Sequence, residues 1–172
     1  MLKAVLNEAW KLAPFRVAVV HYNEHPVEKD QERFGFKEAK SWKDVTSGLH
    51  WPIVEEGLYR LLKWTDEYTD HLDVYITENG SAEKDTVSSD GHVHDKRRID
   101  YYSKHFNIAE RAINEGIKLK GYFCWSFIDN YEWTYGYTKR FGIVYCDYNT
   151  LSRIPKDSAY YIRDVIAGYG DF

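Results

Sequence analysis

Residues 74–81 read Val-Tyr-Ile-Thr-Glu-Asn-Gly-Ser, and this stretch decides the fold that we expect for the chain. Its β-branched and aromatic residues favour a largely buried strand, and the pair Asn79-Gly80 breaks that strand. Glu78 is therefore expected at the strand end, where a barrel of parallel strands presents its catalytic groups. The pattern predicts a catalytic carboxylate at Glu78. The alternative is a glutamate that is simply solvated at the rim.

Strand and helix patterns alternate along the chain on both sides of this stretch. Some segments repeat apolar residues at helical spacing, and others are short β-branched runs between turn residues. Such alternation implies an α/β fold with parallel strand pairing. We expect helices at 2–12, 53–68, after Asp95 and at 157–166, strands at 15–22, 74–77 and from Gly121, and a short apolar hairpin element at 141–147.

The helix patterns also predict caps and buried faces. Asp95 is expected to cap the third helix, and Gly116 to end it in the left-handed conformation. Cys124 and Cys146 lie in predicted strands among apolar neighbours, so we expect buried thiols rather than a disulfide or a metal pair. The expected buried faces are Leu58, Leu61, Leu62 and Tyr68 in the second helix, Ile99, Tyr102, Phe106, Ala109 and Ile113 in the third, and Tyr160, Tyr161, Val165 and Ile166 in the last.

Length and charge limit the class of protein. The chain has 172 residues and a mass of 20.4 kDa. This suits one domain but falls short of the roughly 250 residues of a closed eight-stranded α/β barrel. The net charge of -4 comes from interspersed residues, which gives no basic stripe for nucleic acid and no membrane anchor. The chain also lacks a long apolar run and a signal-peptide pattern, so we expect no nucleic acid, no membrane and a cytoplasmic location.

A second informative block spans residues 121–148 and reads GYFCWSFIDNYEWTYGYTKRFGIVYCDY. It is too rich in aromatic and carboxylate side chains to be read simply as core. Together with residues 74–81 it resembles glycoside hydrolase family 1, the β-glucosidase and β-galactosidase family. The resemblance runs from about Val19 to Ile166 in the family's order and spacing. It implies that residues 1–172 are a single C-terminal segment of a (β/α)8 barrel, a partial TIM barrel with about the last three βα units.

The resemblance also implies roles for individual side chains. Glu78 matches the nucleophile in the family's I-T-E-N-G motif and would hold a covalent glycosyl intermediate. Trp125 and Trp133 match the aromatic platform beneath the sugar, and the alternative is that both are core residues. Glu132 matches the carboxylate that accepts hydrogen bonds from two sugar hydroxyls, and Phe141 matches the aromatic residue that closes the same pocket.

The same comparison bears on the substrate. Family members that act on phosphorylated sugars usually carry a small hydroxyl residue and a lysine near the position of Trp133. Here Trp133 and Thr134 favour an unphosphorylated sugar. The pair Lys139-Arg140 matches a structural pair of the family, for which we expect a solvated or salt-bridged role. The implied substrates are β-linked oligosaccharides or aryl or alkyl β-glycosides, with gluco and galacto forms both open.

The acid/base of the family has no counterpart here. It lies in a T-x-N-E-P motif on the fourth strand, and this sequence contains no such motif. Residues 21–24 align with the family's N-Y-Y-T segment on the sixth strand. Tyr22 is retained, but Asn23 stands in place of the tyrosine that hydrogen-bonds the nucleophile. Glu24, on the strand next to Glu78, is considered as a replacement acid.

Three hypotheses follow from this incomplete site. A half-barrel would become active with a partner that carries the first strands. A remnant would be a non-catalytic carbohydrate-binding or structural module, and two copies would pair their sheets into an improvised closed barrel. We expect no cofactor. His92 and His94 lie in a polar loop without a third ligand at useful spacing, so we also expect no metal site.

Overall fold

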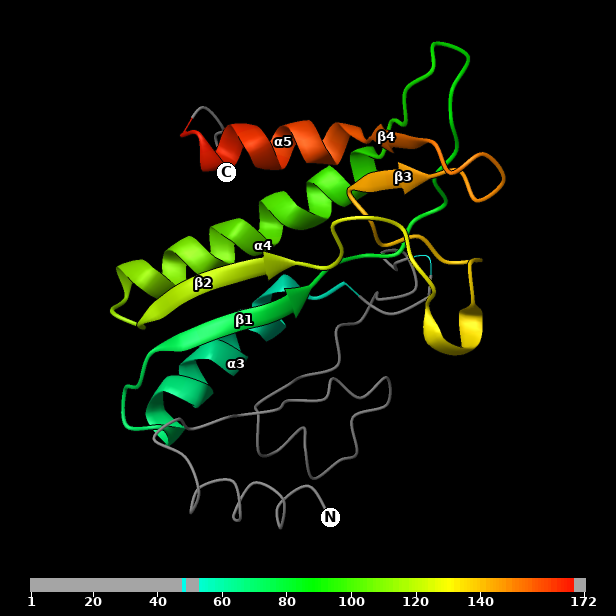
Figure 1. Cartoon of the computed structure of the whole chain (residues 1–172). Helices are drawn as coiled ribbons and strands as arrows, with labels where there is room; N and C mark the ends of the chain where they lie inside the picture. The colour runs from blue at the N-terminus through cyan, green and yellow to red at the C-terminus, as the bar shows by residue number, and fades with distance from the viewer. Residues whose placement is uncertain (1–47, 49–52, 169–172) are drawn as a thin grey trace.

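The computed structural model describes Gly48 and residues 53–168, in which helices and strands alternate (Figure 1). Strands β1 and β2 pair in parallel, as predicted, and β3 and β4 form an antiparallel pair. The predicted helix at 2–12 and strand at 15–22 lie outside the described residues. In chain order the elements are α3 (Glu55–Tyr68), β1 (Val74–Asn79), α4 (Lys96–Asn114), β2 (Leu119–Cys124), the 3₁₀ helix η2 (Trp133–Tyr135), β3 (Val144–Cys146), β4 (Arg153–Pro155) and α5 (Asp157–Ile166).

The main core lies between the β1–β2 sheet and the helices α3 and α4. In Figure 1 both helices run alongside the two strands. Val74 and Ile76 of β1 pack against this core, as expected for alternate residues of a strand with one covered face. The buried members of the core are Tyr59 and Leu62 of α3, Ile108, Ala109 and Ala112 of α4, Ile117 just before β2, and Leu119 at the start of β2.

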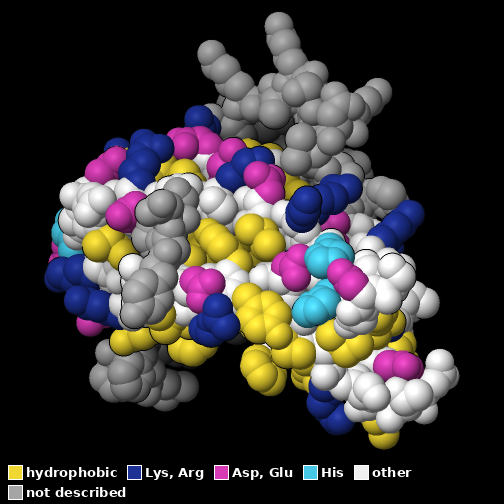
Figure 2. Space-filling view, turned by 90° about the horizontal axis from the view of Figure 1, so that it is seen from above, with side chains coloured by type: hydrophobic (Ala, Val, Ile, Leu, Met, Phe, Trp, Pro, Cys, Tyr) yellow, Lys and Arg dark blue, Asp and Glu magenta, His cyan; other side chains and the backbone are white. Residues whose placement is uncertain are grey.

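The other face of the β1–β2 sheet carries exposed aromatic rings. Tyr75 is 56% exposed and Phe123 is 58% exposed. Tyr75 pairs with Gly121, where an added Cβ would lie 2.7 Å from the Tyr75 ring and 3.4 Å from the Phe123 ring. The two rings therefore lie on one face beside the bare glycine backbone. Figure 2 shows other hydrophobic side chains that also reach the surface, in patches between charged residues.

Helix α5 packs on α4 through a different stripe from the one that we predicted. Tyr161 packs against the cluster formed by Tyr101 and Tyr102 of α4, but the buried centre of the stripe is Ile162. Tyr160 is exposed, and Ile166 is 81% exposed. The prediction assumed contact with the sheet. Because α5 lies mainly against α4 and also meets β4, only one narrow stripe of its surface is covered.

In α3 and α4 the predicted burial of Tyr68 and Ile113 is wrong, and the predicted helix stop at Gly116 is confirmed. Tyr68, the last residue of α3, is exposed and stacks on Trp64 with ring centroids 4.8 Å apart. Ile113 is half exposed, because the small Ala109 and Ala112 form the contact with the core. Gly116 follows α4 with φ of 96°, as predicted for a left-handed helix stop. Leu62, Tyr102 and Ala109 are buried as predicted, and Leu58, Leu61, Ile99, Phe106 and Val165 are half-buried.

Asp95 occupies the N-cap position of α4 but does not cap that helix with its side chain. Its carboxylate instead accepts hydrogen bonds from the Ser158 backbone N–H at 2.8 Å and from the Ser158 hydroxyl at 2.5 Å. Ser158 lies in the first turn of α5, so Asp95 satisfies an N–H group of a different helix. The predicted cap is therefore wrong for α4, because the neighbouring helix takes the carboxylate.

Candidate functional site

The carboxyl ends of β1 and β2 lie side by side and bring two predicted site residues together. Glu78 is exposed in β1, and Trp125 directly follows β2. The Trp125 backbone N–H donates to the Asn79 carbonyl at 2.8 Å. A Cβ on Gly80 would lie 1.7 Å from the Trp125 carbonyl oxygen, so only glycine permits this contact. These two contacts hold the carboxyl ends of β1 and β2 close together.

Glu132 comes near both of these residues. Partial burial raises the pKa of the Glu132 carboxyl above its ordinary value, a hydrogen bond from the Trp125 side chain lowers it, and the negative charge of Glu78 raises it. The effect of Glu78 means that the two carboxylates lie within electrostatic reach. None of the ion pairs found among the described residues includes either carboxylate. Two like charges and one indole N–H therefore converge at the strand ends.

The three predicted aromatic site residues lie in different environments. Trp133 begins η2 and is 82% exposed, which excludes a core role for this residue. Trp125 is half-buried and packs against a small cluster of Ala82 and Phe141. Phe141 is itself buried, so it supports Trp125 from the protein side. An exposed indole and a half-buried one that packs on Phe141 each offer an apolar face of the kind that stacks against a sugar ring.

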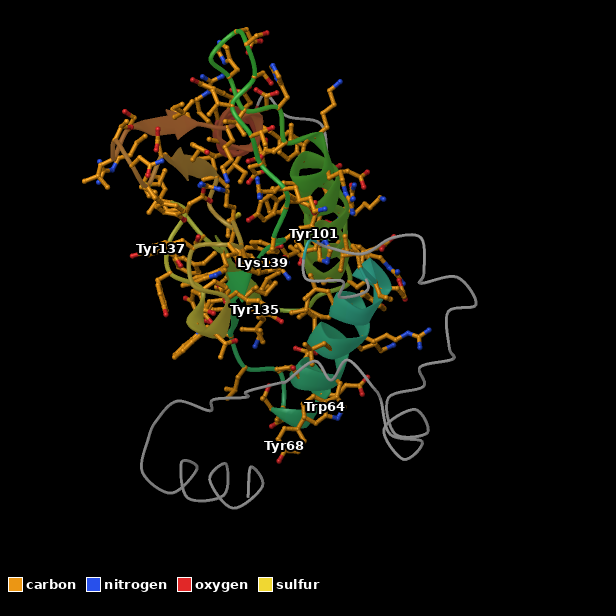
Figure 3. All side chains as sticks on the ribbon, turned by 90° about the vertical axis from the view of Figure 1, so that its right-hand side faces the viewer. Trp64, Tyr68, Tyr101, Tyr135, Tyr137 and Lys139 are labelled. Atoms are coloured by element: carbon orange, nitrogen blue, oxygen red, sulfur yellow. The ribbon has the colours of Figure 1, made fainter. Side chains whose placement is uncertain are left out.

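The loop that carries η2 is rich in further aromatic rings. Figure 3 shows Tyr135, Tyr137 and Lys139 in this region, away from Trp64 and Tyr68 on α3. The Lys139 ammonium lies 5.6 Å from the centroid of the Tyr135 ring and donates to the Gly48 carbonyl at 2.6 Å. Tyr137 meets Tyr131 edge-on at 5.2 Å. Lys139 therefore ties this loop to the segment before α3.

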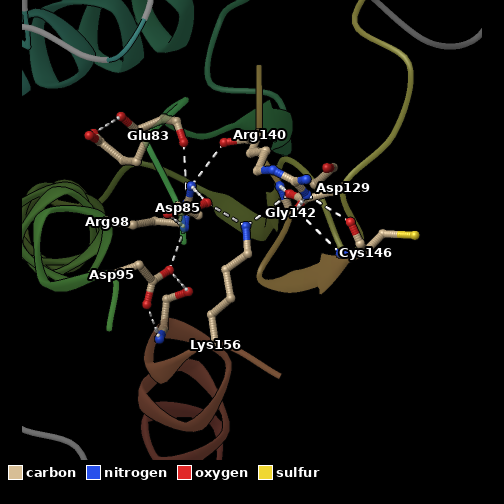
Figure 4. A network of polar contacts seen from close by, with 12 residues as sticks. Glu83, Asp85, Asp95, Arg98, Asp129, Arg140, Gly142, Cys146 and Lys156 are labelled. Carbon is tan, nitrogen blue, oxygen red and sulfur yellow. Dashed lines mark hydrogen bonds and ion pairs between the residues drawn. The ribbon is translucent and has the colours of Figure 1, made fainter. Parts of the chain in front are cut away.

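A buried network of charged residues lies next to the site, and of its ion pairs the sequence indicated only one for Arg140 (Figure 4). The Arg98 guanidinium donates to Asp85 at 2.7 Å and also bonds Asp95. Burial lowers the pKa of Arg98, but the charges and hydrogen bonds of Asp85 and Asp95 raise it above its ordinary value. Arg98 also donates to the backbone carbonyls of Ser81 and Arg140 at 3.2 and 2.9 Å.

The second half of the network centres on Asp129. Its carboxylate accepts from Lys156 at 2.9 Å, from Arg140 at 2.6 Å and from the Gly142 backbone N–H at 3.0 Å. The expectation of a salt-bridged role is thus confirmed for Arg140. Lys156 also donates to Asp85 at 2.5 Å and so joins both halves. A buried charge is tolerated only when it is paired and hydrogen-bonded, and these charges are.

The helical periodicity of the sequence also pointed to Arg98 as a buried member of the network. Arg98 lies on α4 at helical spacing from the buried Tyr101, Tyr102 and His105, so its position on the covered face was predictable. Asp85, Asp129 and Lys156 lie in irregular segments without periodicity. No local pattern distinguishes them from surface charges.

The other two predicted site residues, Tyr22 and Glu24, lie outside the described residues. His94 lies between two carboxylates, with Nδ1 2.7 Å from Asp157 and Nε2 3.0 Å from Asp90. Within residues 53–168 and at Gly48, no group of three or more His, Cys, Asp or Glu side chains could hold a metal ion. Both Cys124 and Cys146 are free thiols.

None of the helices in the described part of the chain combines the length and apolar character that a membrane span requires.

Sequence comparisons relate the chain to glycosidases. The profile of glycosyl hydrolase family 1 matches residues 8–170. The chain is 47% identical over 157 residues to beta-glucosidase A of Thermotoga maritima, a match that covers 90% of this chain and 34% of that protein. It is 42% identical over 117 residues to a 6-phospho-beta-galactosidase of Staphylococcus aureus, which covers 67% of this chain and 25% of that protein.

Structure comparisons agree with this relation. The family 1 β-glucosidase from Thermotoga maritima aligns with a TM-score of 0.72 and 52% sequence identity, over 74% of this chain and 29% of that chain. The same enzyme in complex with deoxynojirimycin aligns with the same TM-score. The chain therefore spans about a third of the length of the relatives that it matches.

Proposed function

Because the chain belongs to glycosyl hydrolase family 1, we propose that it acts in the hydrolysis of β-glycosidic bonds, with Glu78 as the nucleophile of a retaining reaction. The observation that carries this proposal is the convergence of Glu78, Glu132 and Trp125 at the carboxyl ends of two parallel strands. Strand ends of this kind are where the barrel fold assembles its chemistry.

In the proposed reaction a carboxylate oxygen of Glu78 attacks the anomeric carbon of the sugar. A bond forms between these atoms, and the bond to the leaving-group oxygen breaks with its electron pair on that oxygen. Water then displaces Glu78 from the glycosyl intermediate. The proton for the leaving group and the base for the water would come from a residue outside the described part, for which Glu24 is one candidate.

The proposed sugar contacts follow from the surroundings of Glu132. This carboxylate would accept hydrogen bonds from two sugar hydroxyls, while Trp125 and Trp133 face the apolar side of the ring and Phe141 closes the pocket. Because Glu78 opposes the ionisation of Glu132, hydroxyl donors would also compensate the excess negative charge. Trp133 and Thr134 favour an unphosphorylated glycone. The substrate class is a β-linked oligosaccharide or an aryl or alkyl β-glycoside.

The chain is further proposed to be a partial (β/α)8 barrel, with about the last three βα units in one C-terminal segment, residues 1–172. Support comes from the match to about a third of the relatives' length and from the exposed Tyr75 and Phe123 on one face of the sheet. A partner with the first strands would cover that face, and a second copy of this chain is the alternative. The two free thiols favour the cytoplasm as its location.

A fluorinated substrate tests the nucleophile in a reaction that needs no acid catalyst. The chain is incubated with a dinitrophenyl 2-deoxy-2-fluoro-β-glucoside, whose leaving group departs without protonation, and its intact mass is measured. We expect one fluoroglucosyl adduct on the wild-type chain and none on Glu78→Gln. Glu67→Gln, which removes an exposed carboxylate on α3, is the matched control and should label normally.

A folded chain that gains no adduct would favour the second candidate, a carbohydrate-binding module without turnover. The observation that favours it is Asn23, which stands where the family has the tyrosine that hydrogen-bonds the nucleophile. This candidate predicts quenching of tryptophan fluorescence by deoxynojirimycin, and the loss of that quenching in Trp125→Phe. A chain that neither labels nor binds would contradict both functions.

A further inference from the structure

Lys156 is a buried cation between two chain segments that each lead to a site carboxylate. Its side chain is fully buried at the start of α5, and its ammonium lies 2.5 Å from Asp85 and 2.9 Å from Asp129. Figure 4 shows the side chain extending from α5 to these two residues. Lys156 does not touch Glu78 or Glu132 and is not part of the proposed chemistry.

The segment on the Asp85 side begins directly after Glu78. Between the two residues the chain is held at several points: Gly80 fits against Trp125, the Ser81 carbonyl accepts from Arg98 at 3.2 Å, and the Glu83 backbone N–H donates to the Arg140 carbonyl at 3.1 Å. A segment fixed at this many points has little freedom to absorb a displacement of Asp85. A shift at Asp85 would therefore reach Glu78.

The segment on the Asp129 side leads to Glu132 within three residues. The Asp129 backbone N–H donates to the Val144 carbonyl at 3.0 Å, and the Asn130 side chain donates to the Ser126 hydroxyl at 3.1 Å. A Cβ on Gly142 would lie 2.1 Å from the Asp129 nitrogen, which shows how tightly this loop is packed. A shift at Asp129 would therefore reach Glu132.

We propose that Lys156 is a positioning residue that sets the spacing between Glu78 and Glu132 by holding Asp85 and Asp129 on one ammonium, an inference that rests on the proposed function. Without this cation the carboxylates of Asp85 and Asp129 would face each other as like charges. Arg98 binds Asp85 and Arg140 binds Asp129, each from its own half of the network, so neither arginine bridges the two carboxylates. Lys156 is the group that makes the bridge.

The test removes the bridge without leaving an unbalanced charge. The double variant Lys156→Met/Asp85→Asn deletes one cation and one anion, so that Arg98 still pairs with Asp95 and Arg140 with Asp129. The matched control is Lys104→Met/Asp100→Asn, which removes an exposed pair on α4 with a 2.7 Å contact. Lys156→Arg is the conservative variant that should restore the bridge.

The readout is the electrostatic coupling between the two site carboxylates. Glutamate carboxyl carbons are labelled with ¹³C, and the pKa of Glu132 is measured by NMR titration with and without Glu78→Gln in each background. The difference between the two values is the coupling. A role limited to stability would lower the unfolding midpoint and leave this coupling unchanged in the folded chain.

We expect the coupling to fall to about half or less in the double variant, because the interaction weakens as the distance grows. It should stay at the wild-type value in the Lys104 control and recover in Lys156→Arg. If the double variant does not fold, Asp85→Asn alone should also reduce the coupling. An unchanged coupling in the folded variant would overturn the inference and leave the proposed function intact. No coupling in the wild-type chain would overturn both.

Discussion

The buried network and the carboxylate pair of exposed Glu78 and half-buried Glu132 lie at the same end of the β1–β2 sheet, and their charges are arranged differently. In the network every carboxylate has a cation within hydrogen-bond distance, and the side chains are almost completely buried. Glu78 and Glu132 take part in none of the ion pairs of the described residues, and the pKa of the Glu132 carboxyl is raised first by burial and then by the negative charge of Glu78. Balanced charges fix the loops, and unbalanced charges remain available to a ligand.

Because of this difference, we expect the network to contribute to the stability of the fold and the pair Glu78 and Glu132 to contribute to the chemistry. Removing one partner of a buried ion pair leaves an uncompensated charge and is strongly destabilising. Removing one of two like charges relieves repulsion instead. Substitutions in the two regions should therefore change the free energy of unfolding in opposite directions.

The largest expected effect comes from Arg98→Met. This change leaves Asp85 and Asp95 without their guanidinium partner, so we expect a loss of about 3–5 kcal/mol in the free energy of unfolding. Urea denaturation measures it. The control is Arg97→Met at the neighbouring, exposed position, which should cost less than about 1 kcal/mol. Equal losses in the two variants would show that burial of the network does not matter.

A smaller loss is expected from Gly142→Ala. The new Cβ would lie 2.1 Å from the Asp129 nitrogen, so the loop must shift, at a cost of about 3 kcal/mol. Gly91→Ala is the control, because a Cβ there meets no atom within 4 Å and only its left-handed φ of 83° opposes the change, at about 1 kcal/mol. Thermal unfolding compares the two. A larger loss of stability in Gly91→Ala than in Gly142→Ala would contradict this expectation.

For the pair Glu78 and Glu132 we expect a substitution to increase the free energy of unfolding, whereas substitutions in the network decrease it. Glu132 has a folded-state pKa above its ordinary value of 4.5, so its ionisation opposes folding at higher pH. Glu78→Gln removes part of that opposition and should stabilise the chain at neutral pH by less than about 1 kcal/mol. The gain should vanish well below pH 4.5, where Glu132 is protonated in both states. Urea midpoints at the two pH values test this, and a destabilised Glu78→Gln at neutral pH would contradict it.

The smallest effect concerns His94, whose charge is compensated at the surface. Hydrogen bonds that the His94 ring donates to Asp157 and then to Asp90 raise the pKa of His94 above its ordinary value of 6.5. Protonated His94 therefore stabilises the fold fully below pH 6.5, and this contribution is lost as the pH rises through the folded-state pKa. His94→Gln should lower the urea midpoint on the acid side of this range and have less effect on the alkaline side. A uniform loss at all pH values would rule this out.

Local patterns predicted the elements that form the scaffold. The β-branched run before Glu78 and the helical spacing around Tyr102 each specify an element by periodicity, and Gly116 marks a helix end by its conformational freedom. Which face of α5 would be covered did not follow from its own sequence. That depends on the contact with α4, which replaced the expected contact with the sheet and left Ile166 exposed.

The candidate site was predictable where a short motif carried it. Glu78 and Glu132 come from two recognisable blocks, and their approach follows from parallel pairing of β1 and β2. The supporting network was not predictable, because its bonds join residues far apart in the chain. Asp85 and Lys156 are 71 residues apart, and nothing near either residue specifies the other.

The hydrogen bond from the Ser158 amide to Asp95 has a consequence for local opening of the molecule. An amide in the first turn of a terminal helix usually exchanges with deuterium when that turn frays. Here the amide is held by a carboxylate of another helix that is itself paired with Arg98. The beginning of α5 and the beginning of α4 should therefore open as one cooperative unit, and Ser158 should exchange far more slowly than the amides at the other end of α5.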